Sequence, residues 1–446
     1  MALKPLDIFK FLPKTNCKEC GFPTCLAFAM QIAMGKEELA KCPYVSESAR
    51  AELSRSAAPP IRTVVIGKDS GKVTLGGETV LHRHEKTFYN PTAIGVKIAE
   101  GMPEEEITRR IAAVSQVKCE RVGLKLQPNL IAVQDEGKGR FKELARRASD
   151  TGLALVLISD DADRLRQTAQ EFQAARPLLM PASSQGRDNV VQCAKDLSLP
   201  CAVIGSDAED LAGRAQEAER AGVKDIVLAI VNASPSVVFR TLVTVRRAAI
   251  LGRISQLGHP VLALPYLLTD DRLLESVYAA VMVAKYASAL VLSDLSGETF
   301  FPLALARLNI FTDPQRPMAT PEGVYEIGSP TKDAPVFLTS NFSLTYYIVS
   351  GEIENSRTPA YLLVQDTEGL SVLTSWAADK LNAETIAALV KKTKIEEKIS
   401  HRTLILPGVL SQVVGELEEE LPGWKILLGP REASHLPAFV RNLPAR

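Results

Sequence analysis

The sequence predicts a multidomain α/β protein: a small N-terminal module, a (β/α)8 TIM-type barrel and a C-terminal Rossmann-like domain with a parallel sheet. Three observations predict it. Four of the seven cysteines lie close together near the start, eight apolar runs alternate with helical stretches in the middle, and a second alternating series follows a segment rich in Pro and Gly. A chain of 446 residues is long enough for each part to have its own core.

The N-terminal module is defined by Cys17, Cys20, Cys25 and Cys42, with the spacing C-x2-C-x4-C-x16-C. The first three lie in a loop with Gly and Pro, CKECGFPTC, whose turns can point several sulfurs at one centre. A helix capped by Thr24 is expected to bring the fourth back to them. Thiolates in a compact apolar loop suit a 4Fe–4S cluster. A zinc site is the first alternative, although zinc modules usually use two short C-x2-C knuckles, and a disulfide pair is the second.

The segment after this module predicts a β-hairpin. Its turn, GKDSGKV, resembles a phosphate-binding loop, but only three residues separate Gly67 from Gly71, and Val73 stands where Ser or Thr is required. Alternating apolar residues on both sides favour a hairpin instead. The three cysteines outside the N-terminal module are expected to be buried apolar residues: Cys119, Cys193 and Cys201.

The middle of the chain predicts the barrel. Its apolar runs begin near residues 130, 153, 177, 201, 225, 261, 289 and 309. Eight strands alternating with helices favour a closed barrel over an open doubly wound sheet. At the carboxyl ends of the strands, where barrels bind ligands, stand Asp135, Asp160, Asp207, Asn232 and Asp294. We interpret this barrel as a scaffold, because Asp commonly caps helices and no His or Lys accompanies these carboxylates as an acid or base.

The last part alternates again. Four strand-like runs end in turns of small or polar residues, TSNFS, QDTEGLSVLTS, LPGVLS and LGPREASH. In a parallel sheet these turns lie along one edge, where such sheets bind ligands. Gly369, Ser371, Gly408 and Gly429 would let the backbone approach a large flat ligand. An ordinary nucleotide-type or ligand-free α/β domain is the alternative.

These elements divide the chain into five segments. The Pro- and Gly-rich stretch 313–335 contains the second linker. The expected bounds are a cluster domain at 1–57, a linker and hairpin at 58–90, the barrel at 91–315, a linker at 316–325 and the α/β domain at 326–446.

Composition agrees with an ordinary globular protein, at 46% hydrophobic and 23% charged residues. Lys+Arg and Asp+Glu are equal at 52 each, which gives no support to a nucleic-acid partner. Nothing at the start resembles a signal peptide. The longest apolar region, 276–293, carries Lys285 and is better interpreted as a helix followed by a strand than as a membrane span. We therefore expect a cytoplasmic protein whose cysteines are thiols or metal ligands.

Together the three parts closely resemble the large subunit of the corrinoid iron–sulfur protein of the reductive acetyl-CoA pathway, called the gamma subunit of acetyl-CoA decarbonylase/synthase in archaea. The resemblance covers the whole chain. It rests on CKECGFPTC…KCPY, on the barrel, and on LTSNFSLTYY, EGLSVLTSWAADK and LPGVLSQVVGELEEELPGW. The cysteine module alone is shared with other redox proteins, so the combination carries the resemblance.

The resemblance implies a methyl carrier in carbon dioxide fixation, of the methyltransferase class but not a stand-alone catalyst. A corrinoid cobalt, as Co(I), would take a methyl group from methyltetrahydrofolate bound on a separate methyltransferase and pass it to acetyl-CoA synthase/CO dehydrogenase. The 4Fe–4S cluster would reduce inactive Co(II). A heterodimer with a small barrel subunit is also implied. The alternatives are an iron–sulfur electron-transfer protein without corrinoid, and a self-sufficient folate-binding methyltransferase barrel.

The resemblance further implies a cobamide bound base-off, without an axial nitrogen. Many corrinoid domains carry D-x-H-x-x-G, whose histidine is the lower axial ligand, but His401 and His435 stand in no such motif. Thr374 should lie nearest the lower face of cobalt, and the turn at 408–410 should admit the nucleotide tail. The full set of implied corrinoid contacts is Ser340, Asn341, Thr345, Tyr346, Gly369, Leu370, Ser371, Val372, Leu373, Thr374, Gly408, Val409, Leu410, Gly429, Arg431, Glu432 and Ala433.

Overall fold

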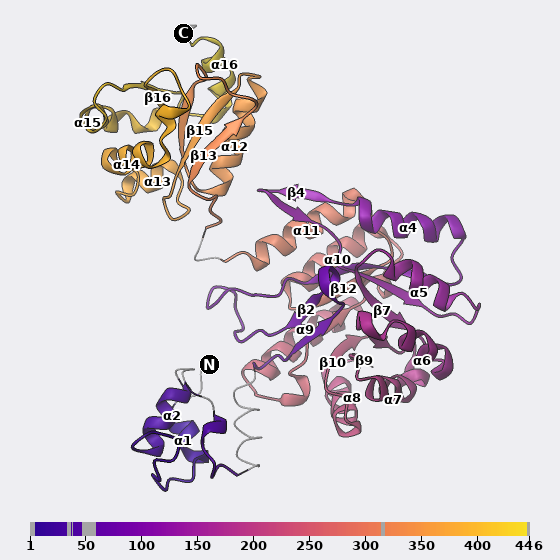
Figure 1. Ribbon diagram of the computed structural model, residues 1–446. Helices are drawn as coiled ribbons and strands as arrows, with labels where there is room; N and C mark the ends of the chain where they lie inside the picture. Colours follow the sequence, from indigo (N-terminus) through magenta and orange to yellow (C-terminus); the bar gives the residue numbers. More distant parts are fainter. Residues whose placement is uncertain (1–4, 34–36, 38, 47–58, 314–316, 444–446) are drawn as a thin grey trace. The chain divides into compact units, whose positions relative to one another are not determined.

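The computed structural model describes residues 5–33, 37, 39–46, 59–313 and 317–443 (Figure 1). These form two compact units. Unit 1 contains the chain up to Cys119 and Gln127–Phe311, and unit 2 contains Glu120–Leu126 and the chain from Thr312 onward.

The N-terminal module of unit 1 is helical. Its elements are α1 (Pro5–Phe11), α2 (Cys25–Ala33) and the 3-10 turn η1 (Leu39–Lys41). The predicted cap of α2 is confirmed, because Thr24 Oγ1 accepts a hydrogen bond from the Ala27 N–H at 3.1 Å. Ile8, Leu12 and Phe28 form a small apolar core with three of the cysteines.

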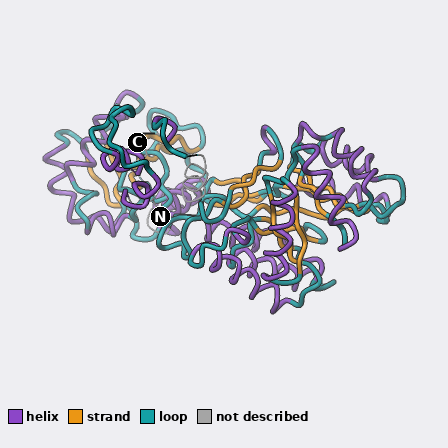
Figure 2. Tube along the Cα trace, turned by 90° about the horizontal axis from the view of Figure 1, so that it is seen from below, coloured by secondary structure: helices purple, strands orange, loops and turns teal. Residues whose placement is uncertain are grey.

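The barrel is closed and TIM-type, as predicted, with eight parallel strands. The strands lie inside a ring of helices (Figure 2). In chain order the strands are β3 (Ala93–Ala99), β6 (Leu130–Gln134), β7 (Ala154–Ile158), β8 (Leu178–Met180), β9 (Cys201–Gly205), β10 (Ile226–Ile230), β11 (Val261–Ala263) and β12 (Ala289–Leu292). The helices are α4 (Glu104–Gln116), α5 (Phe141–Ser149), α6 (Ala162–Glu171), α7 (Arg187–Leu197), α8 (Ala208–Ala221), α9 (Pro235–Ile250), α10 (Arg272–Ala284) and α11 (Gly297–Phe311).

One predicted barrel strand is wrong and another was missed. The run near residue 309 belongs to the end of α11, where Leu303 and Arg307 are buried one helical turn apart. The eighth strand of the barrel is instead β3, which comes first in the chain and was not predicted. Its run AIGVKIA is interrupted by Gly95 and Lys97, which hides the apolar pattern. Gly95 is required there, because a Cβ would lie 2.2 Å from the Leu130 carbonyl oxygen of the next strand.

The predicted hairpin is confirmed and closes the amino end of the barrel. Strands β1 (Thr63–Ile66) and β2 (Val73–Gly76) pair antiparallel. Ile66 and Leu75 belong to the same buried cluster as the inward-facing residues of the barrel strands. The Arg62 N–H donates to the carbonyl of Gly258 at 2.9 Å, just before β11. The hairpin therefore fills the barrel from the end opposite the ligand-binding edge of TIM barrels.

The remaining expectations for unit 1 concern the apolar region and the cysteines. Residues 276–293 form the end of α10 and then β12, as predicted. Among the described helices, none combines the length and apolar character needed to cross a membrane. Cys193 and Cys201 are buried, as predicted, and burial raises the pKa of the Cys201 thiol to about 12. Cys119 is half-buried in the short strand β4 (Cys119–Arg121), which precedes β5 (Leu124–Leu126).

Unit 2 is a five-stranded sheet with the order β13-β15-β14-β16-β17. Four strands are parallel and β13 is an antiparallel edge strand. One face is buried by α14 and α15 and the other by α12 and α16. The strands are β13 (Gly323–Ile327), β14 (Val336–Ser340), β15 (Ala360–Gln365), β16 (Thr403–Leu406) and β17 (Lys425–Leu428). The helices are α12 (Ser343–Asn355), α13 (Val372–Ala377), α14 (Ala383–Thr393), α15 (Val414–Glu420) and α16 (Leu436–Arg441).

Two predictions for this region differ from the structure. Strand β13 lies within 313–335, where we expected a linker, because the pattern GVYEI pairs fully with β15 despite its Gly and Pro neighbours. The helix-forming sequence AADKLNAETIAALVKKT at 377–393 is also predicted to form one helix, but in the structure it contains the end of α13, a break and then α14. Asp379 has φ +57°, and Asn382 caps α14 by accepting from the Thr385 N–H at 2.9 Å.

Candidate functional site

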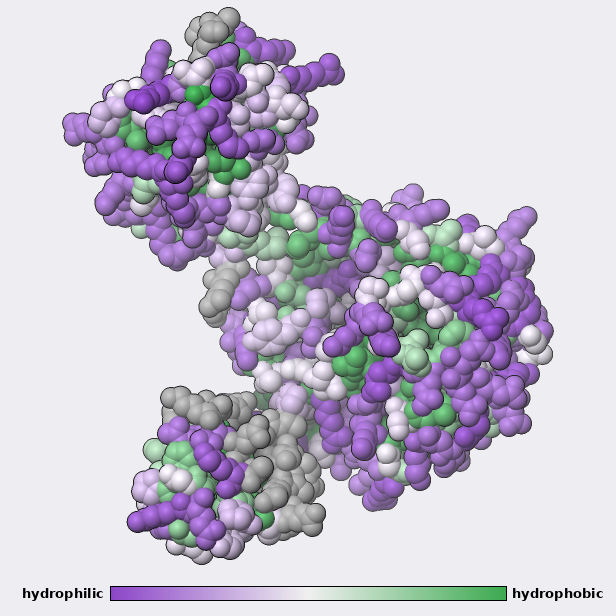
Figure 3. Space-filling view, viewed as in Figure 1, coloured by the Kyte–Doolittle hydropathy of each residue, from purple (hydrophilic) through white to green (hydrophobic). Residues whose placement is uncertain are grey.

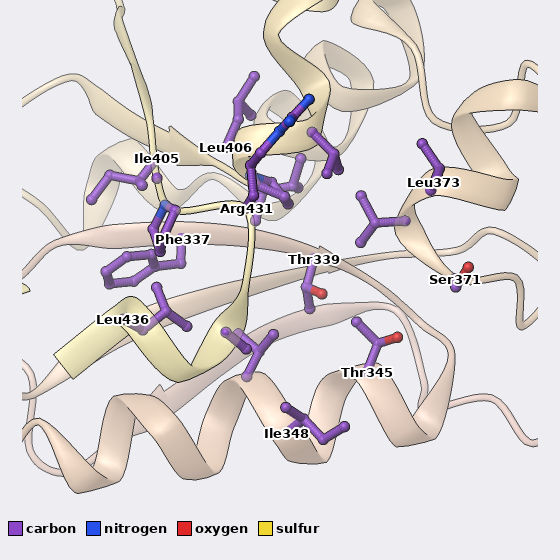
Figure 4. Close-up of a pocket in the computed structure, with 18 residues that line it drawn as sticks. Phe337, Thr339, Thr345, Ile348, Ser371, Leu373, Ile405, Leu406, Arg431 and Leu436 are labelled. Atoms are coloured by element: carbon purple, nitrogen blue, oxygen red, sulfur yellow. The ribbon is translucent and has the colours of Figure 1, made fainter. Parts of the chain in front are cut away.

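The carboxyl edge of the unit 2 sheet contains a cavity of about 310 Å³ (Figure 4). Its walls come from β14, β16, α12, the start of α13 and the turn after β17. This is the edge at which the sequence predicts ligand binding. The structure brings eight of the predicted contact residues together around it: Thr345, Ser371, Val372, Leu373, Val409, Gly429, Arg431 and Ala433.

The floor of the cavity is apolar except at one point. Phe337, Ile405 and Leu436 are buried there. The side chains at the rim are more exposed: Ile348 is 48% exposed and Leu373 is 56% exposed. The cavity thus has a buried apolar floor and an exposed apolar rim.

Thr339 is the polar residue at this floor, and it is not among the contact residues that the sequence predicts. Its side chain is 0% exposed, and its Oγ1 has no hydrogen-bond partner among the described residues. A buried hydroxyl without a partner costs about 1–3 kcal/mol. The alternation along β14 could have found it, since Phe337 and Thr339 share one face of the strand.

Ser340 lies on the other face of the same strand. It pairs in register with Gln365 of β15. Both are buried, and neither Ser340 Oγ nor Gln365 Oε1 has a partner among the described residues. Ser340 does not line the cavity, so its predicted corrinoid contact stays a prediction.

Asn341 organises the loop after β15. Its Oδ1 accepts from the N–H of Thr367 at 3.0 Å, the Thr367 hydroxyl at 2.9 Å and the N–H of Gly369 at 2.9 Å. Its Nδ2 donates to Asp366 Oδ1 at 2.8 Å. Asn341 is itself only 4% exposed. Its amide therefore positions the loop that leads to the segment expected beneath the corrin ring.

That segment is held by short-range polar contacts. The Leu370 carbonyl accepts from the Thr367 hydroxyl at 2.9 Å, and the hydroxyls of Ser371 and Thr374 lie 2.9 Å apart. Thr374 is exposed and does not line the cavity. Its hydroxyl thus lies at the surface of unit 2 beside the cavity rim, available to a ligand that covers that rim.

Glycines in the predicted turns serve the protein's own backbone. Gly369 has φ +77°, a conformation that L side chains rarely adopt. At Gly408 a Cβ would lie 2.5 Å from the Gly429 carbonyl oxygen, so the turns after β16 and β17 approach each other only with glycine there. These glycines shape the cavity edge without needing a ligand to explain them.

The other predicted contacts lie apart from the cavity. Leu410 is 0% exposed in the core on the α14 side, whereas Glu432 is exposed. Tyr346 packs against Tyr325 and Tyr347, with ring centroids 4.8 and 5.0 Å away. Burial raises the pKa of Tyr346 to about 12. For these residues the corrinoid contact stays a prediction.

The two histidines of unit 2 occupy different ends of the sheet. The His401 ring lies 3.0 Å from the Ala334 carbonyl oxygen through Nε2, and its Nδ1 accepts from the Thr403 N–H at 3.2 Å. Because Thr403 begins β16, this ring lies at the amino end, away from the cavity. His435 is exposed in η9 (Ala433–His435).

The N-terminal module gathers the predicted thiols in part. Cys20, Cys25 and Cys42 are buried in one apolar cluster, and Cys17 is exposed. The Tyr44 hydroxyl donates to Glu19 Oε1 at 2.7 Å, which ties the segment after Cys42 to the first cysteine loop. That hydrogen bond and the charge of Glu19 raise the pKa of Tyr44. Thiols in a compact apolar loop suit an iron–sulfur cluster in donor type. In the part of the chain that the structure describes, no three His, Cys, Asp or Glu form a group able to hold a metal ion.

Two carboxylates at the barrel's carboxyl end are neutralised by arginines. Asp135 accepts from the Ser159 hydroxyl at 2.6 Å and from Arg164 Nε at 2.9 Å. Asp294 accepts from Arg109 at 2.8 Å, and Arg272 Nη1 lies 2.9 Å from the same oxygen. Neither is available as an uncommitted acid or base.

The other polar residues at this end have structural partners as well. Asp160 accepts from the Ser183 hydroxyl at 2.6 Å and from two backbone N–H groups. Asp207 caps α8, which is the role we expected of these Asp residues if they bind no ligand. Asn232 has φ +53°, which asparagine tolerates better than most residues.

The fold and these sites define a class of multidomain α/β protein. It has a cysteine-rich N-terminal module, a TIM-type barrel whose polar residues at the carboxyl end have partners within the protein, and a cavity at the edge of a second sheet. A family model described as "CO dehydrogenase/acetyl-CoA synthase delta subunit" matches residues 63–440, and one described as "Putative Fe-S cluster" matches 12–44. The corrinoid/iron-sulfur protein large subunit of Moorella thermoacetica is 41% identical over 445 residues, covering 99% of both chains. The acetyl-CoA decarbonylase/synthase complex subunit gamma of Methanothermobacter thermautotrophicus is 32% identical, again covering 99% of each. The chain therefore belongs to the family of corrinoid/iron-sulfur protein large subunits and acetyl-CoA decarbonylase/synthase gamma subunits, as its sequence motifs predict.

Among solved structures, a dihydropteroate synthase from Thermus thermophilus matches with a TM-score of 0.40 and 14% identity. It covers 56% of this chain and 100% of that one. A likeness at this level supports no inference about ligands.

Proposed function

We propose that the chain is a corrinoid-dependent methyl carrier that also holds a 4Fe–4S cluster. The observation that carries this proposal is the cavity at the carboxyl edge of unit 2, with its apolar floor and unpartnered Thr339 hydroxyl, in a member of this family. A bound corrinoid would supply cobalt that, as Co(I), accepts a methyl group from methyltetrahydrofolate on a separate methyltransferase and delivers it to acetyl-CoA synthase. The remaining roles belong to the protein's own residues.

Unit 2 would hold the corrinoid at the cavity rim. Ser371, Leu373 and Thr374 present an exposed or half-exposed surface from the start of α13, and Asn341 holds the loop before it in place. No described histidine of this unit lines the cavity. This supports a cofactor held by side chains around it rather than by an axial nitrogen ligand.

The N-terminal module would hold the cluster through Cys17, Cys20, Cys25 and Cys42. Three of them already share one apolar cluster, which excludes water around the thiolates and favours a low-potential centre. Its electrons would restore inactive Co(II) to Co(I). None of these four cysteines, as the structure describes them, is in a disulfide bond, so each is available as a cluster ligand.

The barrel would serve as a docking scaffold for the small subunit. Its carboxylates are paired internally, yet α10 presents an outward apolar stripe at helical spacing. Leu273, Val277 and Val281 are 66%, 56% and 41% exposed, and Phe301 of α11 is 38% exposed. Figure 3 shows hydrophobic surface where α11 lies. A barrel subunit with a matching apolar face would bury this stripe.

The carrier proposal predicts that the chain co-expressed with its small subunit contains about one cobalt and about four irons, with a corrinoid spectrum under anaerobic conditions. Cys20→Ser should lower the iron content and abolish reduction to Co(I) by a low-potential donor, while cobalt content stays unchanged. Cys119→Ser, outside the module, should change neither. Iron without cobalt in corrinoid-replete cells would contradict the carrier role and indicate an iron–sulfur electron-transfer protein.

The docking proposal predicts that Val277→Asp weakens assembly with the small subunit by at least about tenfold, because a buried carboxylate without a partner is costly. The measurement is the dissociation constant of the purified subunits. Leu251→Asp is the matched control, since Leu251 is 60% exposed just after α9 and lies off the stripe. Equal affinity of both variants for the small subunit would place the interface elsewhere.

A further inference from the structure

Lys97 of β3 faces the interior of the barrel near its carboxyl end. Its register partner is Ala132, which belongs to the buried cluster inside the barrel, and residues paired across parallel strands point to the same face. The Lys97 amine lies 4.4 Å from the centroid of the Tyr266 ring, which packs against the same cluster. Because Ala99 ends β3, the Lys97 side chain lies close to the end at which TIM barrels bind ligands.

Three polar groups at this end make no hydrogen bond with the described part of the chain: the Lys97 amine, the Tyr266 hydroxyl and the Gln134 side-chain amide. Gln134 ends β6 and shares the inward face of that strand with Leu130 and Ala132. Burial raises the pKa of Tyr266 to about 12, so its hydroxyl stays protonated at neutral pH and can donate a hydrogen bond. All three residues are partly exposed, so a ligand has access to them.

The carboxylates around Lys97 already have donors of their own. The aspartates at this end are paired as described above. Glu136 Oε2 accepts from the Gly101 N–H at 2.8 Å, and Glu275 accepts from the N–H and the hydroxyl of Ser293 at 2.6 and 2.5 Å. No described carboxylate forms an ion pair with Lys97, whose pKa is lowered by burial and raised by the charge of Glu136. Lys97 is therefore a cation that an added anion can pair with.

The remaining side chains that face this end of the barrel interior are largely apolar. Ile158 of β7, Ile204 of β9 and Val231 after β10 belong to the buried cluster inside the barrel. A few polar groups among apolar walls are typical of a small-molecule site. One ammonium group neutralises a single negative charge, so a ligand with one carboxylate and an apolar part suits this end better than phosphate does.

We propose that the carboxyl end of the barrel binds a small organic monocarboxylate, whose charge pairs with Lys97 and whose oxygens accept hydrogen bonds from the Tyr266 hydroxyl and the Gln134 amide. The inference is independent of the proposed corrinoid function, and it gives the barrel a ligand site in addition to its docking role. Lys97 is not among the residues that the sequence predicts at this end, because β3 was not predicted as a strand.

The test uses the full chain and three probes: butyrate, butyramide, which has the same shape without the charge, and inorganic phosphate. Dissociation constants of butyrate and butyramide are measured by saturation-transfer NMR, and phosphate is tested as a competitor of butyrate. The variants are Lys97→Met, which removes the charge and keeps the chain length, and Tyr266→Phe, which removes only the hydroxyl. Lys224→Met is the matched control, because Lys224 is exposed just before β10, at the opposite end of the barrel. Circular dichroism checks that each variant is folded.

The expected result is that butyrate binds the unsubstituted chain at least about tenfold more tightly than butyramide, and that Lys97→Met removes this preference. Tyr266→Phe should weaken butyrate binding about three- to fivefold, and Lys224→Met should leave it unchanged. Equal affinity of butyrate and butyramide, or equal affinity of Lys97→Met and Lys224→Met for butyrate, would overturn the inference. Displacement of butyrate by phosphate at a lower concentration than that of butyrate itself would overturn the choice of a monocarboxylate.

A second measurement locates the site without any substitution. Butyrate should slow the modification of the Lys97 amine by an acylating reagent, measured by mass spectrometry of the peptide that contains it. The exposed Lys138, which follows β6 at the same end of the barrel, should react at an unchanged rate. This measurement also decides the matter if Lys97→Met does not fold. Unchanged modification of Lys97 at saturating butyrate would overturn the inference.

Discussion

Replacing Asn341 with alanine is expected to weaken corrinoid binding by about 100-fold. The substitution removes the acceptor shared by the Thr367 and Gly369 N–H groups, both buried. Each buried donor left without a partner costs about 1–3 kcal/mol, and about 2.7 kcal/mol corresponds to 100-fold. The loop before Ser371 would then lose its fixed shape. The measurement is the cobamide dissociation constant, with faster amide hydrogen exchange at 366–371 in the cofactor-free chain.

The matched control separates positioning of the loop from direct contact. Thr367 is 0% exposed, and its hydroxyl donates to Asn341 or to the Leu370 carbonyl, so it cannot touch a ligand at the surface. Thr367→Val should reproduce part of the loss in affinity and part of the faster exchange. Unchanged affinity and exchange in Thr367→Val, with a large loss in Asn341→Ala, would instead favour direct contact by Asn341.

Replacing Arg246 with methionine is expected to destabilise the barrel by about 3–5 kcal/mol, because it leaves a buried carboxylate unpaired. Arg246 Nη1 lies 3.0 Å from Glu78 Oε2, and both residues are buried. Its guanidinium also lies 4.9 and 4.8 Å from the ring centroids of Phe88 and Tyr286. Burial lowers the pKa of Arg246, while Glu78 raises it. The measurement is the free energy of unfolding from urea denaturation, followed by circular dichroism.

The double variant identifies the cause. Glu78→Leu together with Arg246→Met should recover most of the lost stability, since no charge then remains buried. A double variant as unstable as Arg246→Met alone would assign the loss to packing around Phe88 and Tyr286.

Much of the fold was predictable because strands and helices have different periods. Runs such as those of β7 and β10 are continuously apolar, and this alone indicates buried parallel strands. Strand β3 was not predicted because Gly95 interrupts its apolar pattern. Glycine is required at this position by the close approach of Leu130 on the next strand, a contact that the local sequence does not show. Strand β13 was not predicted because it is an edge strand with only one buried residue, and such a strand needs few apolar side chains.

The site was predictable as a region rather than residue by residue. The turns after β14, β15, β16 and β17 share one edge, which follows from parallel strands alone. Whether a turn residue faces the cavity depends on tertiary packing. Leu410 is buried in the core, whereas Arg431 lines the cavity. Thr339 was missed because it lies inside a strand, and a hydroxyl there gives no local signal until its missing partner is visible.

The hairpin at the amino end of the barrel also has a consequence for the order of folding. The hairpin lies early in the sequence and is synthesised first, but the backbone groups that it contacts belong to Gly152, Arg176 and Gly258, which are synthesised much later. Ile66 and Leu75 belong to a buried cluster whose other members extend to the last barrel strands, so this cluster is complete only when those strands are present. Contacts so distant in sequence slow folding. The hairpin can therefore complete its native contacts only after these later segments of the barrel have been synthesised.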